Sequence, residues 1–288
     1  MQVADLSEGS VWTFRHPTIR DALSEIVASD QELIDVYLLG TPTKTLLEEV
    51  TCIGITVRGA RVVLPKSKYS ALISILKDLD PNAIAAFLTD RADEAFLSEF
   101  INARPKFAKE LLVRMRHSPT LAAPLLARLF EHDLLNDGLR SEYALLVEEY
   151  CVTQPAADFI DNEDVSRLLT AMESQRIRER IQAEVIPELD SIVDGWEGGY
   201  DSGDDPEQFF ESLTGTLDRF ASSFADDEEA VEQINFAQRR ISEVVERLMD
   251  EDSTRHEDQY VDDDYYMRAG GRDDGPDFER DPFEDVDR

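Results

Sequence analysis

The chain has few lysines, few cysteines and no long apolar run. Six lysines stand against 23 arginines, and these 29 basic residues face 62 acidic ones, so the formal net charge is −33. Proteins that bind nucleic acids neutralise the phosphates with clustered Lys and Arg side chains. We therefore expect no direct binding to nucleic acid.

The two cysteines, Cys52 and Cys151, lie far apart in the sequence and form no C-x-x-C pair. This spacing excludes zinc ribbons and disulfide frameworks. It predicts two small buried hydrophobic side chains in a reducing compartment. No early apolar run has the length of a secretory signal, and no stretch of about 18 apolar residues could span a bilayer. We expect a cytoplasmic protein without a membrane partner.

The sequence also lacks the common catalytic and metal-binding motifs. It has no G-x-x-x-x-G-K-[ST] phosphate loop, no G-x-G-x-x-G after a strand, no H-E-x-x-H and no G-x-S-x-G elbow. The acidic segment 201–205 suggests a calcium loop, but Pro206 and Ser212 stand where an EF-hand needs Gly and Glu. His132, between two acidic residues, could bind a metal, although the surface end of a helix explains it at least as well. We predict no catalytic residue, no metal site and no cofactor in the isolated chain.

Acidic residues are the most prominent feature that the chain does have. In molar salt the Debye length is only about 3 Å, so the self-repulsion of a compact acidic protein is largely screened. Acidity along the whole chain, with few lysines, favours a halophilic source. The alternative, a dedicated acidic binding surface, predicts a concentrated run of charge.

Residues that favour helix ends occur throughout the first part of the chain. Pro17 suits the first position of a helix, because its missing N–H would have no partner there. Asp30 is expected to cap a helix that Gly40 ends, and Thr41 or Thr43 to cap the next one. The elements predicted here are a turn at 6–10, a strand at 11–15 and helices at 17–28, 31–39 and 44–50.

The middle of the chain predicts a small hairpin followed by short helices. β-branched alternation around Gly59 indicates a β-hairpin within 53–64, and Pro65 then opens a helix at 65–79. Helices of 8 to 15 residues should follow up to residue 150, with tight connections that predict a stacked helical array. The breaks between them are expected at 80–81, 104–105, 118–119 and 136–138.

Two longer helical stretches follow a loop at 153–161. A helix is predicted at 174–196, and a strict heptad-like spacing then indicates two helices that form an antiparallel hairpin. The apolar positions of the first are Phe210, Leu213, Leu217, Phe220 and Phe224. Those of the second are Val231, Ile234, Ile241, Val245 and Leu248, interrupted by Gln238. A bundle core explains these aromatic residues better than a cofactor site.

Residues 251–288 hold 15 acidic and five basic residues with few aliphatic ones, a composition typical of disorder. Spaced aromatic residues within this tail could form a short linear motif that folds on a partner. The predicted partner-binding residues are Phe278, Pro282, Phe283 and Asp285. The alternative is a solvated tail typical of a halophile.

Residues 12–28 read WTFRHPTIRDALSEIVA, a strand, a histidine and an amphipathic helix. This segment resembles the F-x-H-x-T/S-hydrophobic pattern in the winged-helix domain of STAND-type signalling NTPases. Residues 17–52, which include ELIDVYLLGTPTKTLLEEVTC, look like the helical segment after the winged helix in the novel STAND group of bacteria and archaea. The final PFEDVD is similar as well.

The resemblance implies the C-terminal part of such an NTPase, from a haloarchaeal source, without the P-loop ATPase domain. In this class the histidine contacts the β-phosphate of bound ADP and holds the protein inactive. It therefore implies that His16 senses ADP, but only when an ATPase half is present. The competing interpretation is a structural histidine at a strand–helix corner.

The fold class predicted from these patterns is mainly α. It comprises a partial winged-helix remnant with a small β-hairpin, a stacked helical array, a long antiparallel helical hairpin and a disordered acidic tail. The predicted divisions are 1–52 (winged-helix remnant and following helices), 53–160 (short-helix array), 161–250 (long-helix bundle) and 251–288 (tail).

The predicted function is that of a non-catalytic regulatory and sensor module of a split or truncated STAND NTPase, in signalling or defence. Its partner would be an NTPase-bearing protein or an upstream half. The alternative is a free-standing helical interaction or scaffold protein of a halophile, with no nucleotide dependence.

Overall fold

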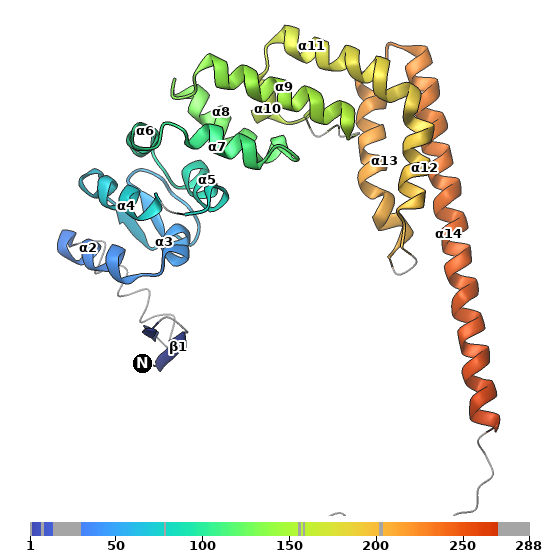
Figure 1. The fold of residues 1–288 in the computed structure, drawn as a ribbon, viewed down its shortest axis with the longest axis horizontal. Coiled ribbons are helices and arrows are strands. Elements are labelled where there is room, and N and C mark those ends of the chain that lie inside the picture. Colours follow the sequence, from blue (N-terminus) through green and yellow to red (C-terminus); the bar gives the residue numbers. More distant parts are fainter. Residues whose placement is uncertain are drawn as a thin grey trace, which may run out of the picture.

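The computed structural model describes residues 2–6, 9–13, 30–77, 79–154, 157, 159–201 and 204–269, with side chains between 30 and 251. The protein is mainly α, as predicted. The described elements form an arch (Figure 1). Strands and short helices make one limb, short helices continue over the top, and long helices make the other limb. None of the described helices is long and apolar enough to cross a bilayer.

The N-terminal strands form a hairpin. β1 (Gln2–Leu6) pairs antiparallel with β2 (Gly9–Thr13), so that Val3 lies opposite Trp12. The strand predicted at 11–15 is thus present, but it begins earlier and has a partner strand where no strand was predicted. The helix predicted at 17–28 lies outside the described residues.

The next two helices have the predicted positions and only one of the predicted caps. Asp30 accepts a hydrogen bond from the backbone N–H of Glu32 at 2.8 Å and so caps α2 (Gln31–Gly40). Gly40 does not end the helix in a left-handed conformation; it is the last helical residue. α3 (Thr43–Glu49) follows Pro42 and has no side-chain cap, so the threonine cap was wrong.

The hairpin predicted within 53–64 is instead a parallel pair. β3 (Val50–Cys52) pairs with β4 (Val62–Leu64), and Val50 lies opposite Val62. All three residues of β3 are buried, and parallel strands buried in this way lack polar alternation. The prediction failed because the alternating segment 53–61 is a loop, with Gly59 at a φ of +86°.

Short helices then follow one another with the predicted breaks and one that was not predicted, at 91–93 between α5 and α6. After a 3₁₀ turn, η1 (Lys66–Lys68), they are α4 (Tyr69–Leu76), α5 (Pro81–Asp90), α6 (Glu94–Ala103), α7 (Phe107–Arg114), α8 (Ala123–Glu131) preceded by η2 (Pro119–Ala122), and α9 (Asp137–Thr153). Asp80, Asp93 and Asn136 cap three of them through side-chain oxygens, which supply the acceptors that helix N-termini need. The stacked helical array is confirmed.

Aromatic rings fill the core of this array. Phe96 is fully buried and packs edge-on against Tyr69 and Phe87, with ring centroids at 5.1 and 5.6 Å. Phe100 continues the chain of rings to Phe107 at 5.0 Å. These rings come from α4, α5, α6 and α7, so one cluster holds four helices together.

A single arginine joins α8 to the end of α5. Arg128 donates to the carbonyl oxygens of Leu88 (2.7 Å), Thr89 and Ala92. The last carbonyls of a helix have no partner within the helix, and this guanidinium supplies one. Burial lowers the pKa of Arg128 from its ordinary value.

Beyond α10 (Glu163–Leu168), the helix predicted at 174–196 is a bent helical path. α11 (Ala171–Arg180) leads into a π-helical turn (Ile181–Val185), a 3₁₀ turn (Ile186–Glu188) and α12 (Leu189–Gly198). Pro187 explains the interruption, because it lacks an N–H and its ring clashes with the preceding turn of a regular helix.

Two groups of ion pairs fasten α11 to α9. Arg140 donates to both carboxylate oxygens of Glu173, at 2.7 and 3.2 Å. Glu148, which is 8% exposed, accepts hydrogen bonds from Arg176 and Arg180. These contacts join the short-helix array to the elements that lead into the long helices.

The long helices α13 (Pro206–Ser223) and α14 (Glu228–Ala269) form the predicted hairpin. The apolar positions predicted in α13 are all buried. In α14 the buried positions are Ala230, Ile234, Ala237, Ile241 and Val244. The register assumed for α14 was therefore partly wrong. Ala237 continues the heptad spacing where Gln238 had suggested an interruption, and Gln238 instead donates to Asp218 at 2.7 Å.

α14 also extends past residue 251, where the tail was predicted to begin. α14 continues without a break to Ala269, so half of the segment predicted as a tail is helical. An already formed helix extends one residue at a time at little cost, whereas starting a new one is unfavourable. Residues 270–288 lie outside the described residues.

Replacing Phe96 by Ala should destabilise the fold by about 3–5 kcal/mol, because it leaves a cavity where α4, α5 and α6 meet. Phe236→Ala is the matched control, since Phe236 is 52% exposed and its loss should cost less than about 1 kcal/mol. Urea unfolding followed by circular dichroism measures both. Equal losses would mean that the ring cluster does not hold the array together.

Glu173 should make stability depend on pH. The hydrogen bond from Arg140, with further ones from Thr170, lowers the pKa of Glu173 from 4.5 to about 2. A carboxyl with a lowered folded-state pKa stabilises the fold above its unfolded pKa, and this stabilisation is lost as the pH falls through the folded pKa. Glu173→Gln, which keeps a side chain suited to the capping box, should therefore reduce the free energy of unfolding at pH 7. The gap should narrow between pH 4.5 and about 2, and a pH-independent gap would contradict this role.

Candidate interaction surfaces

The residues predicted to carry function lie outside the described part of the chain. They are His16, the predicted ADP sensor, and Phe278, Pro282, Phe283 and Asp285, the predicted partner-binding motif. Their roles stay predictions.

The described histidines and acidic loops form no metal site. His132 Nδ1 lies 3.8 Å from Glu94 Oε2, and within the described ranges no group of three or more His, Cys, Asp or Glu side chains could hold a metal ion. Asp205, in the segment that suggested a calcium loop, accepts hydrogen bonds from the N–H groups of Glu207 and Gln208. It is the N-cap of α13.

Both cysteines are buried, as predicted, and neither forms a disulfide. Cys52 is fully buried in β3, and this burial raises the pKa of its thiol to about 11. Nucleophilic cysteines need a thiolate near neutral pH, so Cys52 is unsuited to covalent catalysis. Cys151 is 1% exposed.

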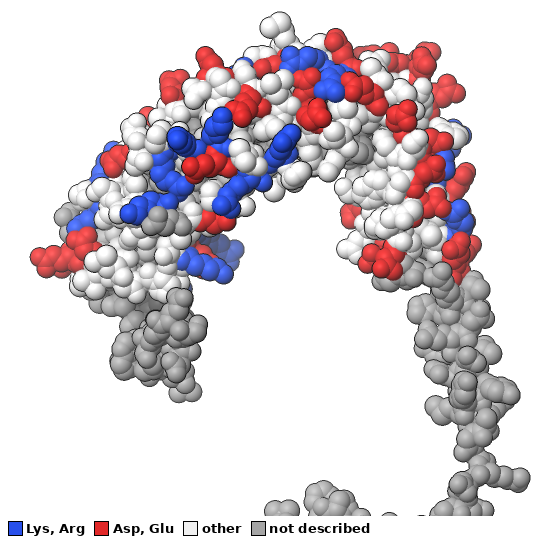
Figure 2. Space-filling model, viewed as in Figure 1, with Lys and Arg blue, Asp and Glu red and all other residues white. Residues whose placement is uncertain are grey.

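Charge is not spread evenly along the chain, which corrects the assumption made from overall composition. Residues 51–130 hold twelve basic and seven acidic residues, a net charge of +5, whereas the rest of the chain carries −38. Figure 2 shows Lys and Arg gathering over the short-helix limb of the arch and acidic residues dominating the long-helix limb. Exposed members of the basic surface include Lys106, Lys109, Arg114 and Arg116.

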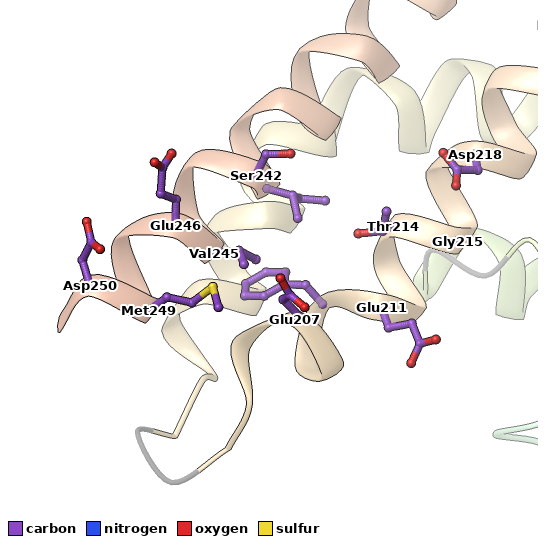
Figure 3. Close-up of a pocket in the computed structure, with 12 residues that line it drawn as sticks. Glu207, Glu211, Thr214, Gly215, Asp218, Ser242, Val245, Glu246, Met249 and Asp250 are labelled. Carbon is purple, nitrogen blue, oxygen red and sulfur yellow. The ribbon is translucent and has the colours of Figure 1, made fainter. Parts of the chain in front are cut away.

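A groove of about 810 Å³ lies between α13 and α14. Its apolar lining consists of Phe210 from α13 and Ile241, Val245 and Met249 from α14. Figure 3 shows Thr214 and Gly215 on one side of the groove and Ser242 and Val245 on the other. Met249 is 43% exposed, so part of this apolar lining faces solvent.

Carboxylates follow both edges of the groove. They are Glu207, Glu211 and Asp218 on α13 and Glu246 and Asp250 on α14, and no Lys or Arg lines it. Asp218 accepts the hydrogen bond from Gln238. Among the described residues, Glu207, Glu211 and Glu246 take part in no ion pair.

α12 packs against the opposite side of α14. Arg240 pairs with Asp190 and Asp194 of α12, and Arg247 pairs with Glu197. An α-helix turns by about 100° per residue, so Met249 lies about 180° around α14 from Arg240. α12, α13 and α14 therefore form a three-helix bundle that is covered on the α12 side and open along the groove.

No family model, no curated protein and no solved structure matches the chain. The site must therefore be argued from its own geometry.

Sequence patterns found the helices of the groove but not the groove itself. Phe210, Ile241 and Val245 were predicted as core residues, and Phe210 and Ile241 are buried. The missed signal was Gly215, a glycine in the interior of an otherwise regular 18-residue helix.

Neither thiol should react in the native protein. We expect no modification by a thiol reagent at pH 8 within the time that modifies a small free thiol, because both side chains are buried and Cys52 is protonated. Two thiols per chain should react after unfolding in guanidinium chloride. Rapid native-state labelling, located by mass spectrometry, would show that these positions open readily to solvent.

Proposed function

We propose that the chain is a non-catalytic regulatory and sensor module of a split or truncated STAND-type NTPase, which couples nucleotide state to partner binding. The observation that supports a binding role most directly is the open groove on a three-helix bundle, carried by an arch of stacked helices. Such helical arrays present extended surfaces to other proteins.

The nucleotide part of this proposal rests on the resemblance around His16. A histidine that contacts the β-phosphate of ADP needs an ATPase half to hold the nucleotide. The partner is therefore an NTPase-bearing protein, and signalling or defence is the process in which such a module would act.

The second candidate is a helical interaction protein without nucleotide dependence. A partner protein could bind in the groove without any nucleotide. The groove therefore supports this second candidate if no ATPase partner exists. Reading the DNA upstream of the first codon for a phosphate-loop motif distinguishes the two candidates.

Binding of the chain to a matching ATPase half should be tighter with ADP than without it. His16→Ala should remove the ADP-dependent part of the affinity, because the imidazole would no longer contact the phosphate, and should leave the far-ultraviolet circular dichroism unchanged. Calorimetric titration of the two purified proteins, with and without ADP, measures the effect.

His117→Ala is the control for this experiment, since His117 is exposed after α7. It should bind like the unaltered chain under both conditions. If ADP has no effect on the unaltered chain, or if His16→Ala unfolds it, the sensor role is wrong.

A further inference from the structure

The long-helix bundle has three helices where a fourth would fit. α12 covers one side of the α13–α14 pair, and the groove runs along the other. In four-helix bundles each helix packs against two neighbours around a shared apolar core. In the described groove Val245 and Met249 are partly exposed above the buried Phe210 and Ile241, in the place that such a fourth helix would cover (Figure 3).

The size of the groove suits a helix of about three turns. Its lining extends from Glu207 to Asp218 on α13 and from Ile241 to Asp250 on α14. At 1.5 Å rise per residue these stretches are about 14–17 Å long. An elongated strip between two helices is the usual site for an amphipathic helix that inserts its apolar face.

Gly215 supports the same interpretation. A glycine in a helix interior costs about 1 kcal/mol relative to alanine. A Cβ at position 215 would meet no atom within 4 Å, and the residue has no positive φ. Neither packing against the described residues nor backbone conformation requires a glycine at this position. Gly195 has the same open space around it, so it is the place of Gly215 in the lining of the groove that matters: a glycine there leaves room for the backbone of a partner to come close.

The carboxylates around the groove indicate which kind of helix would bind there. Five carboxylates border the apolar lining, and none of the lining residues is basic. A second copy of α13 and α14 would bring these carboxylates against an identical set. Lys and Arg side chains flanking an apolar stripe would instead neutralise them at close range.

We propose that the α13–α14 groove binds a basic amphipathic helix of a partner protein, which completes a four-helix bundle. This deepens the proposed function and rests on it only in assigning the chain to protein binding. Apolar residues of the partner at i, i+3, i+4 and i+7 would contact Val245 and Met249, the partly exposed apolar residues of the lining. Basic residues on both flanks would face Glu211 and Glu246.

The test uses the full chain and a synthetic peptide of about 18 residues, because shorter isolated helices are marginal in water. The peptide carries Leu and Ile at helical spacing with Lys on both flanks. A second peptide keeps the apolar stripe and has Glu in place of Lys. Fluorescence anisotropy at one fixed salt concentration measures both affinities, and only the Lys peptide should bind.

Gly215→Leu fills the groove without changing charge and should weaken binding of the Lys peptide at least about tenfold. It adds a better helix former, so the fold should persist. The matched control is Gly195→Leu, an exposed helical glycine of α12 whose Cβ would also meet no atom. It should change the affinity by less than about twofold. Equal affinities for the two variants would mean that the peptide binds by diffuse charge attraction, and would overturn the proposal.

Charge reversal tests the edges. The double variant Glu211→Lys/Glu246→Lys should lose affinity for the Lys peptide and gain affinity for the Glu peptide. If the double variant still prefers the Lys peptide to the Glu peptide, the assignment of a basic partner is overturned. A concentration-dependent oligomer of the unaltered chain that Gly215→Leu abolishes would show that a second copy occupies the groove, and would also overturn it.

These measurements need neither nucleotide nor an ATPase half. If the Lys peptide binds but ADP has no effect on binding to the ATPase half, only the proposed sensor role is contradicted. Loss of groove binding with an intact ADP effect would contradict only the present proposal.

Discussion

Stacking of short helices is the constraint on which the whole structure depends. Apart from α9, the helices between residues 31 and 198 have ten residues or fewer, and isolated helices of this length are not stable in water. Each must bury its apolar face against helices that precede and follow it in the arch. The buried side chains accordingly form one continuous core, from Ile34 in α2 to Val244 in α14. Stability in such an array is a sum of neighbour contacts rather than a property of any one helix.

Arginine is the residue that this chain uses where helices meet. Arg128 satisfies carbonyl groups at the end of α5, Arg140 holds Glu173 with two hydrogen bonds, and Arg240 bridges two carboxylates of α12. A planar guanidinium offers several donors in fixed directions, which a lysine ammonium cannot match. The preference for arginine over lysine in the composition thus has a structural use at the joints, whatever the salt concentration in which the protein works.

The sequence predicted the helical part of the fold well, because its signals are local. Asp30, Asp80 and Asn136 mark helix starts through their own backbone neighbours, and the heptad spacing of α13 depends on one helix alone. The parallel pairing of β3 with β4 could not be predicted, since it depends on a loop that brings Val62 back beside Val50. The extent of α14 was missed for a similar reason: composition describes residues one by one, whereas a helix is extended cooperatively.

The groove could not be predicted from the sequence even though the heptad spacing of α13 was predicted correctly. Heptad spacing predicts which residues of α13 and α14 face each other. The same spacing is expected in a closed four-helix bundle and in a bundle that lacks one helix. Only the position of α12, fixed by Arg240 and Arg247 on one side of α14, shows that the other side is open. Gly215 then acquires a meaning that it lacks in the sequence. In an isolated helix it is a local weakness, and in the groove it is the place where another backbone can come close. The cost of a glycine inside a helix therefore points to a binding role only once the positions of the neighbouring helices are known.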